Sequence, residues 1–390
     1  MIGSFLHIAL LSGILSLTPD QPKTTVTQPE PVTSGTVYQK GDGGYDTFRI
    51  PALVKAKDGS ILAFAEARKL SKSDTGDIDL VVRRSEDGGV TWGDIQMVWD
   101  DADNVCGNPA PVLDKESGKI ILVTTWNKGS DHESDIHART SEDTRRVFVL
   151  FSDDNGKSWS KPREITAQTK DPEWTWYATG PCHGIQICKG RKKGRIIIPC
   201  NHGVFKDGKP AGTLSHLIYS DDLGQNWHIG AVASTGNEST VVELEDGKLM
   251  LNMRVWKNKE IKRTDFDRNA AWSRNGGRSF YRESEVSGLV EPICNASIIN
   301  WRKEGKLTST LLFTNPDHKT KRVNMTLKQS NDNGNTWHPV YSLKGSKAAY
   351  SDLLVFDNGD VGILYECGEK SPYEKIVFTR IPSETVENHR

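Results

Sequence analysis

An eight-residue phrase that recurs along this chain constrains its fold more than any other feature. Four copies run from Ser to Trp, at residues 85–92, 152–159, 220–227 and 330–337, and a fifth, at 273–280, has Asn and Phe in place of Asp and Trp. The shared pattern is S-x-D-x-G-x-T/S/N-W. Short Asp and Ser side chains accept hydrogen bonds from nearby backbone N–H groups, and Gly adopts a positive φ at little cost. The phrase therefore predicts a repeated tight turn, closed by an aromatic ring that packs beside the flanking strands.

The Asp residues of this octet also allow a second interpretation, a calcium-binding loop. Such a loop needs many more oxygen ligands within one stretch than the octet contains. We therefore interpret the octets as structural turns and expect neither a metal nor another cofactor.

A second repeat predicts the number of structural units. Six times a glycine-containing turn precedes a short apolar strand, at Gly59, Gly118, Gly194, Gly247, Gly305 and Gly359. No long segment has helical periodicity. Six units of several strands each are typical of a propeller with four-stranded blades, so we predict an all-β, six-bladed β-propeller. A stacked β-sandwich is the alternative, and the sixfold recurrence argues against it.

The ends of the chain set the limits of this domain. Residues 1–17 contain an apolar run, too short for the roughly 20 residues of a membrane span, that resembles a secretory signal peptide. Residues 18–35 are rich in Pro, Thr and Gln, which predicts a disordered linker. The propeller is then expected over residues 36–385, with residues 36–39 supplying the outer strand of the last blade. On this basis we expect a secreted or periplasmic protein.

The balance of charge excludes some partners. The chain has 50 Lys and Arg against 51 Asp and Glu, so an anionic ligand must be held by a local cluster. We expect no nucleic-acid partner, no integral membrane span and a monomer. The six cysteines contain no C-x-x-C pair. If Gly194 lies at the tip of a hairpin, Cys188 and Cys200 lie opposite each other, which predicts a disulfide between them.

Polar residues at the ends of apolar strands are candidates for a shared site. Arg49 precedes one such strand, Arg254 ends another and Arg322 opens a third. Three guanidinium groups from three blades would form a clamp for a carboxylate, which they bind bidentately. Acidic and phenolic residues occupy similar positions, namely Asp74, Glu238, Tyr350 and Glu366.

Several segments together resemble one known family. They are FRIP at 48–51, AEAR at 65–68, NESTVVEL at 237–244, AYSDL at 349–353 and LYE at 364–366, combined with the repeated octets. In this combination and order the chain resembles the sialidases, or neuraminidases, whose repeated turns are called Asp boxes. The resemblance extends over residues 38–380 and implies a six-bladed propeller.

The resemblance also implies how the chain would bind its ligand. Arg49, Arg254 and Arg322 match the three arginines that bind the carboxylate of sialic acid. Glu366 matches the acid that supports the first of them. Arg68 matches a further arginine that contacts substrate. The expected partners are therefore sialylated glycans, glycoproteins or glycolipids.

Three other residues match the catalytic groups of the family. Tyr350 matches the tyrosine nucleophile, Glu238 its paired glutamate, and Asp74 the loop aspartate that acts as acid and base, with Asp77 as the alternative. Sialidases are known for a tyrosine nucleophile. A neutral phenol avoids repulsion by the substrate carboxylate but needs a neighbouring base. The implied activity is that of an exo-α-sialidase, a glycoside hydrolase that retains configuration through a tyrosyl-enzyme intermediate.

Alternatives share the same repeats. They are a trans-sialidase, a glycosidase for a related nonulosonic acid, and a propeller that binds sialic acid without catalysis. The complete set of Asp74, Glu238 and Tyr350 favours an enzyme over a binding protein. The aromatic stretch 174–180, with residues 183–186, is either a wall beside the bound sugar or a plug in a long blade connection.

Overall fold

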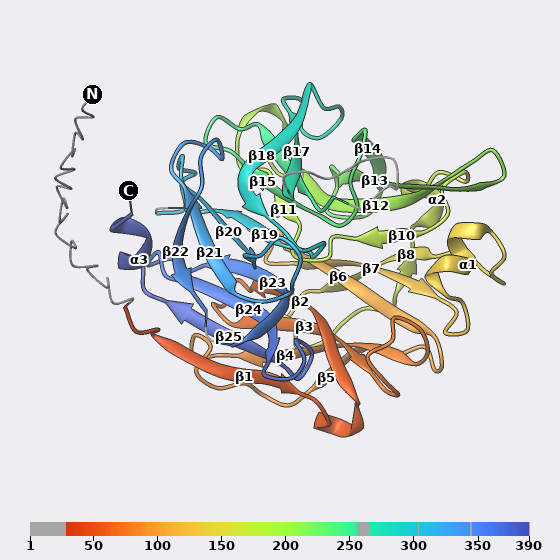
Figure 1. Ribbon diagram of the computed structural model, residues 1–390, viewed down its shortest axis with the longest axis horizontal. Coiled ribbons are helices and arrows are strands. Elements are labelled where there is room, and N and C mark those ends of the chain that lie inside the picture. Colours follow the sequence, from red (N-terminus) through yellow and green to blue (C-terminus); the bar gives the residue numbers. More distant parts are fainter. Residues whose placement is uncertain (1–28, 256–265, 303, 344, 390) are drawn as a thin grey trace, which may run out of the picture.

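The computed structural model describes residues 29–255, 266–302, 304–343 and 345–389. The chain forms a disc of twisted antiparallel sheets arranged around a central axis, with both ends of the described chain on one side (Figure 1). The predicted signal peptide at 1–17 lies outside the described residues. So does most of the predicted linker, although residues 33–35 belong to the first strand, which therefore begins earlier than expected.

Three of the sheets have four strands each, and each follows the simple order of a propeller blade. One has the order β15 (Ser239–Glu243), β16 (Leu249–Met253), β17 (Asp267–Ser273) and β18 (Arg282–Val290). The next has the order β19 (Ser297–Asn300), β20 (Leu311–Pro316), β21 (Met325–Ser330) and β22 (His338–Ser342). The third contains both ends of the described chain, in the order β1 (Thr33–Gln39), β25 (Lys375–Ile381), β24 (Val361–Gly368) and β23 (Lys347–Val355).

The other two sheets are larger. A five-stranded sheet consists of β10 (Tyr177–Thr179), β11 (Ile185–Gln186), β12 (Ile196–Lys206), β13 (Lys209–Ser220) and β14 (His228–Val232). An eight-stranded sheet consists of β2 (Thr47–Lys55), β3 (Ile61–Arg68), β4 (Ile78–Ser85), β5 (Gln96–Trp99), β6 (Val105–Leu113), β7 (Ile120–Asn127), β8 (Arg146–Ser152) and β9 (Arg163–Glu164).

The propeller prediction is confirmed, and the blade count depends on how the eight-stranded sheet is divided. Its two halves, β2–β5 and β6–β9, are each antiparallel, and the one strand pairing between them in the described chain is a parallel bridge between Ile78 and Val105. Strand pairing alone thus gives five sheets in the described chain. Division at this bridge gives the six four-stranded units that the glycine turns predict, with β11 as an addition to one of them.

The apolar core lies between neighbouring blades. Leu364 and Phe378 of the last sheet, for example, pack with Phe48 and Ala63 of the first unit. Six clusters of this kind occupy the junctions between successive units in the described chain. Each unit therefore buries its two faces against its two neighbours, which stabilises the ring as a whole.

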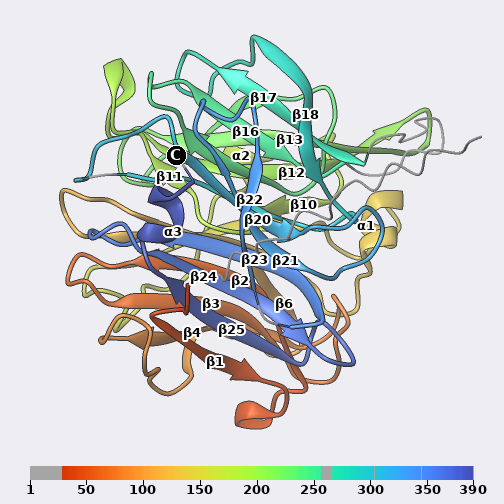
Figure 2. The same cartoon turned by 60° about the vertical axis from the view of Figure 1, so that its left-hand side comes forward.

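The ring closes through strands from opposite ends of the chain. β1 pairs with β25 from Thr33–Arg380 to Gln39–Lys375, as the outermost strand of the last sheet. The strands at the end of the chain lie beside those at its start in both views (Figures 1 and 2). This confirms the prediction that the N-terminal segment completes the last blade.

The octets are turns, as predicted, and each joins the third and fourth strands of its unit in five units. In the second copy the Gly156 N–H donates to Ser152 Oγ at 2.8 Å, and the N–H groups of Lys157 and Ser158 donate to Asp154 Oδ1 at 3.1 and 2.9 Å. The degenerate copy keeps the same turn, because Asn275 Oδ1 accepts from Arg278 N and Ser279 N at 3.0 and 3.1 Å.

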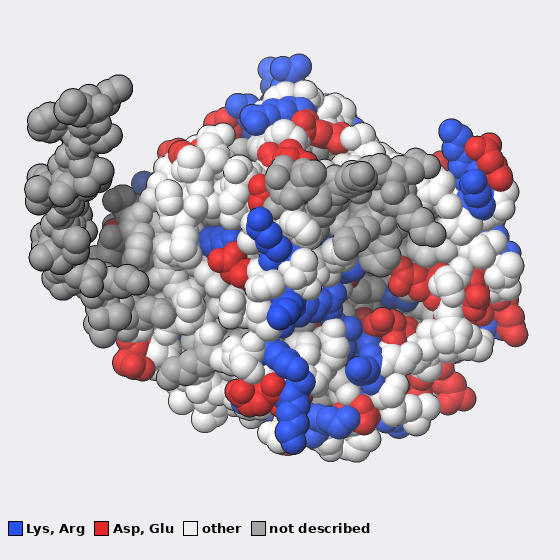
Figure 3. All heavy atoms as spheres, in the orientation of Figure 1, with Lys and Arg blue, Asp and Glu red and all other residues white. Residues whose placement is uncertain are grey.

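Helices are short in the described chain. They are α1 (Glu133–Ala138), α2 (Thr166–Thr169), α3 (Glu384–Glu387) and the 3-10 turns η1 (Asp42–Gly44) and η2 (Gly190–Lys192). None of the described helices has the length and apolar character that crossing a bilayer requires. Positive and negative side chains are interspersed over the face drawn in Figure 3, with several Lys and Arg side chains close together near its middle.

The predicted Cys188–Cys200 disulfide is wrong. All six cysteines are unpaired thiols. β11 and β12 pair Ile185 with Ile197 and Gln186 with Ile196, so the turn is centred before Gly194. This register does not place the two cysteines opposite each other.

Candidate active site

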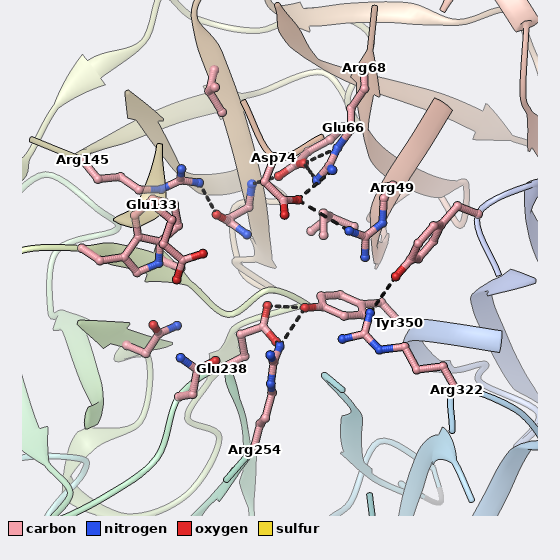
Figure 4. Close-up of a pocket in the computed structure, with 18 residues that line it drawn as sticks. Arg49, Glu66, Arg68, Asp74, Glu133, Arg145, Glu238, Arg254, Arg322 and Tyr350 are labelled. Carbon is pink, nitrogen blue, oxygen red and sulfur yellow. Dashed lines mark hydrogen bonds and ion pairs between the residues drawn. The ribbon is translucent and has the colours of Figure 1, made fainter. Parts of the chain in front are cut away.

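A polar pocket of about 260 Å³ lies where the inner strands of several blades begin or end (Figure 4). Seven of the eight residues selected from the sequence line it: Arg49, Arg68, Asp74, Glu238, Arg254, Arg322 and Tyr350. The eighth, Glu366, lies behind Arg49 and is fully buried. Residues that are far apart in the sequence therefore meet at one place, because four of the six units supply them, three from the first unit.

Tyr350 of β23 lies at the centre of this group. Its hydroxyl donates to Glu238 Oε1 at 2.6 Å and accepts from Arg254 Nη1 at 3.0 Å. Arg254 also pairs with the other oxygen of Glu238. Burial and the charge of Glu238 raise the pKa of Tyr350 well above its usual value, although the nearby arginines lower it. The phenol is thus held protonated, with its proton directed at a carboxylate.

Three guanidinium groups surround this phenol. Arg49 and Arg322 lie 5.1 and 5.5 Å from the centre of the Tyr350 ring, and Arg254 binds the hydroxyl itself. Arg322 is held by Tyr373 Oη and by the Ile293 carbonyl, both at 2.8 Å. Three cations converging on one side of the pocket form a binding site for a carboxylate, because each planar group offers paired N–H donors.

Glu366 of β24 fixes two strands at once. Its carboxylate accepts from Arg49 Nε at 3.1 Å and from the backbone N–H groups of Ile50 and Tyr350 at 2.9 and 3.0 Å. Ile50 has a φ of +58°, which a β-branched residue rarely adopts, and β2 has a bulge there. The bulge turns Arg49 into the pocket, and the bond to Glu366 stabilises this strained backbone.

Asp74 lies in the loop between β3 and β4, at the edge of the pocket. Its Oδ1 is 2.7 Å from Arg68 Nη1 and 3.6 Å from Arg49 Nη1, and 65% of its side chain is exposed. Partial burial acts to raise its pKa, but the charges of Arg68 and Arg49 outweigh this and lower the pKa. The alternative, Asp77, instead pairs with Lys69 at 3.4 Å and is absent from the described pocket lining.

Arg68 holds this loop more than it faces the cavity. Only 2% of it is exposed, and its Nη2 pairs with Glu66 at 2.6 Å. Its Nη1 donates to the carbonyls of Lys72 and Ser73 at 2.7 and 2.9 Å. Arg68 therefore supports Asp74, and it also lines the pocket, where the sequence suggests a substrate contact.

Sequence reasoning missed several residues of the pocket. Glu66 lies two positions before Arg68 on the same face of β3, so strand alternation was an available signal. Arg145 donates to Asn108 Oδ1 at 2.5 Å and lies 4.1 Å from the ring centre of Trp176. Burial lowers its pKa to about 10. Nothing in its local sequence distinguishes it from an exposed arginine.

The aromatic stretch serves both suggested purposes. Trp176 lines the pocket. Trp174 instead stacks on His202 at 3.6 Å, and His216 Nε2 and Tyr177 Oη lie 3.1 Å apart in the buried interior. Two residues of the stretch, Trp176 and Ala178, therefore line the pocket, and Trp174 and Tyr177 form a buried plug.

Comparisons with known proteins identify the family of the chain. Residues 59–363 match the model of the BNR repeat-like domain family. The chain is 31% identical over 350 residues to a sialidase of Bacteroides fragilis (strain YCH46), covering 85% of this chain and 62% of that protein. It is 32% identical over 344 residues to a sialidase of Micromonospora viridifaciens, covering 84% of this chain and 51% of that protein.

A solved structure extends the comparison to three dimensions. The Hadza microbial sialidase Hz136 matches with a TM-score of 0.75 and 32% identity, covering 90% of this chain and 68% of that one. The two curated bacterial relatives described in the previous paragraph are longer than this chain, which spans 62% and 51% of their lengths.

Proposed function

This chain belongs to the sialidase family, and from that premise we propose that it is an exo-α-sialidase that removes terminal α-linked sialic acids from glycans, glycoproteins or glycolipids. The observation that carries the proposal is the 2.6 Å hydrogen bond from Tyr350 to Glu238, made beside three converging arginines. A site that only bound sialic acid would need the arginines but not a phenol paired with a base.

In this proposal the substrate carboxylate binds to Arg49, Arg254 and Arg322. Charge-assisted hydrogen bonds contribute about 1.5–3 kcal/mol each, and Glu366 holds Arg49 in place for them. The carboxylate fixes the anomeric carbon above the Tyr350 hydroxyl. A neutral phenol approaches this carbon without the repulsion that a carboxylate nucleophile would meet.

The first chemical step forms a tyrosyl-enzyme. Tyr350 Oη bonds to the anomeric carbon as the glycosidic bond breaks, and its proton passes to Glu238 Oε1. Asp74 donates a proton to the departing oxygen. Asp74 must be protonated for this, and binding of the substrate carboxylate favours that form because it offsets the charge of Arg49, which lowers the pKa of Asp74 in the free enzyme.

The second step reverses these transfers. Asp74, now ionised, takes a proton from a water molecule, which attacks the anomeric carbon on the face that the leaving group vacated. The bond to Tyr350 breaks, and Glu238 returns the proton to the phenol oxygen. Two displacements at one carbon give a product with retained configuration.

The direct test is hydrolysis of the 4-methylumbelliferyl α-glycoside of N-acetylneuraminic acid. We expect release of the fluorophore, with the α-anomer of free sialic acid as the first product by NMR. Adding lactose as an acceptor separates hydrolysis from transfer, because a trans-sialidase forms sialyllactose. A correctly folded protein that releases no fluorophore contradicts the proposal.

We also propose that the protein is exported. The support is the apolar run within residues 1–17, which lies outside the described residues and has the length of a signal peptide core. Fractionation of an exporting host, with mass spectrometry of the mature N-terminus, tests this, and protein that stays inside the cell with its leader intact would contradict it.

A further inference from the structure

A second cavity, also of about 260 Å³, lies at the other end of the inner strands, and we call it the axial cavity. Along β2, Arg49 and Ile50 line the polar pocket of the candidate active site, whereas residues 53–55 line the axial cavity. Along β23 the pocket is lined by Tyr350, and the axial cavity by residues 353–355. The two cavities share no lining residue among those described, so they are separate sites.

A buried hydrogen-bonded group closes the floor between them. Asp352, fully buried, accepts from His183 Nδ1 at 2.6 Å, from Ser297 Oγ at 2.8 Å and from Leu53 N at 2.7 Å. Asp352 lies two residues after Tyr350 on β23, just beyond an irregularity in the strand pairing between Ala348 and Ser351. Asp352 thus occupies the axis behind the nucleophile and joins several blades there.

His183 presents an unused hydrogen-bonding atom to the axial cavity. The residue is 8% exposed and lines the cavity, and its Nε2 is buried without a partner among the described residues. Burial acts to lower the pKa of His183, but Asp352 outweighs it and raises the pKa. With Nδ1 bonded to Asp352, Nε2 is the remaining polar atom of the ring, and a buried polar atom of this kind requires a partner.

Two cations at the wall of the cavity lack a full counter-charge. Arg302 Nη1 is buried without a partner among the described residues, and Arg302 Nη2 is 4.0 Å from Glu243. The Glu243 carboxylate already accepts from the backbone N–H groups of Cys188 and Lys189 at 2.8 and 2.9 Å. Burial and the charge of Arg302 lower the pKa of Lys115. An additional anion would therefore relieve unfavourable charge at this wall.

The rest of the lining is mostly apolar. Inner strands contribute Leu53, Val112, Val241, Ile298 and Leu353, among others. A concave apolar site with a few convergent polar groups is the usual form of a small-molecule site in proteins. The combination selects for a ligand with an apolar body and one anionic end.

We propose that the axial cavity binds a small organic anion with an apolar body, its anionic group held by Lys115 and Arg302 and its body packed against the inner strands. A polar atom at the other end of the ligand would form a hydrogen bond with His183 Nε2. The ligand does not touch the catalytic groups, so this site goes beyond the proposed hydrolysis and stands independently of it.

The experiment is a calorimetric titration of the full chain with 4-phenylbutyrate and with its uncharged analogue 4-phenylbutyramide. We expect one-to-one binding of the acid and at least about tenfold weaker binding of the amide, because a charge-assisted contact is lost. Lys115→Gln and Arg302→Gln should each weaken binding of the acid by about tenfold. Arg322→Ala, in the polar pocket, and Lys157→Gln, at an exposed octet, should leave it unchanged.

Several results would overturn the proposal. Equal affinity for acid and amide would mean that the cations have no role. Loss of binding in Arg322→Ala would place the anion in the polar pocket, and undiminished binding in both cavity variants would place it elsewhere. No binding of 4-phenylbutyrate to the wild-type chain would also reject the site. Thermal unfolding of each variant checks that the fold is intact, and a crystal with 4-(4-bromophenyl)butyrate locates the ligand by its bromine.

Discussion

At the scale of single residues, the pocket shows how neighbours change what a side chain can do. Tyr350 alone would be a weak nucleophile, since burial raises the pKa of its phenol and keeps it protonated. The bond to Glu238 gives its proton a destination as the oxygen reacts. Arg254 binds the same hydroxyl and would stabilise negative charge that develops on it.

Replacing Tyr350 by Phe tests this arrangement directly. The ring and its packing remain, so we expect the variant to fold with little change in its thermal midpoint. We expect kcat to fall by at least about 10³-fold, since removal of a nucleophile typically costs this much or more, while KM changes little. The matched control is Tyr373→Phe, which removes a hydroxyl bonded to Arg322 and should raise KM instead. Comparable kcat in Tyr350→Phe and wild type would exclude Tyr350 as the nucleophile.

The pair of Asp74 and Arg68 gives a prediction about pH. Arg68 lowers the pKa of Asp74, so removal of its charge in Arg68→Met should raise that pKa. The pH above which kcat/KM falls, as the acid loses its proton, should then move upward. Arg68→Lys keeps a positive charge and should shift this pH by a smaller amount. If kcat/KM falls above the same pH in Arg68→Met as in the wild type, another group supplies the proton.

At the scale of elements, the octet is a turn whose strength comes from one carboxylate. Asp154 accepts from two backbone N–H groups and from the hydroxyls of Ser152 and Ser158. Burial opposes ionisation, but these bonds outweigh it and lower the pKa of Asp154 to about 2. The natural copy with Asn275 shows that an amide oxygen can replace the carboxylate.

This predicts a graded effect of substitution at Asp154. Asp154→Ala leaves the turn N–H groups to water and should lower stability by about 1 kcal/mol, as loss of a helix cap does. Asp154→Asn should cost less, because its amide oxygen still accepts. The carboxylate has a lower pKa in the folded chain, so its contribution is present above pH 4 and is lost as the pH falls toward 2. Unfolding midpoints at pH 7 and pH 3 measure both effects, and equal midpoints for all three proteins at pH 7 would contradict them.

The same scale explains why parts of the site were predictable and others were not. The octets and glycine turns are local, so their chemistry is readable without knowledge of the fold. Arg49 and Tyr350 belong to short family motifs. Arg145 lines the pocket because its unit packs against the next unit, where Trp176 lies under the guanidinium group. No local sequence pattern encodes this contact. The disulfide prediction failed for a related reason, since moving the centre of one turn changes every opposed pair in a hairpin.

At the scale of the whole molecule, the fold depends on a closure that joins the ends of the domain. β1 pairs with β25 along its full length. Tyr38 of β1 is fully buried, donates to the Ala63 carbonyl at 2.7 Å and stacks on Phe48 at 4.9 Å. β1 thus contacts both the last blade and the first, and it covers an edge of β25 that would otherwise be exposed.

Removal of β1 should therefore weaken the entire ring. A chain that begins at Gly41 loses the strand pairing and the burial of Val37 and Tyr38, each worth roughly 1.5–3 kcal/mol of transfer free energy. We expect a lower thermal midpoint and aggregation through the uncovered edge of β25. A chain that begins at residue 29 removes none of the described contacts and should match the full chain. Tyr38→Ala should fall between the two truncations, because the pairing remains while the buried ring is lost. If the chain from Gly41 unfolds at the same temperature as the chain from residue 29, the ring is held by its blade junctions alone, and the closing strand only covers an edge.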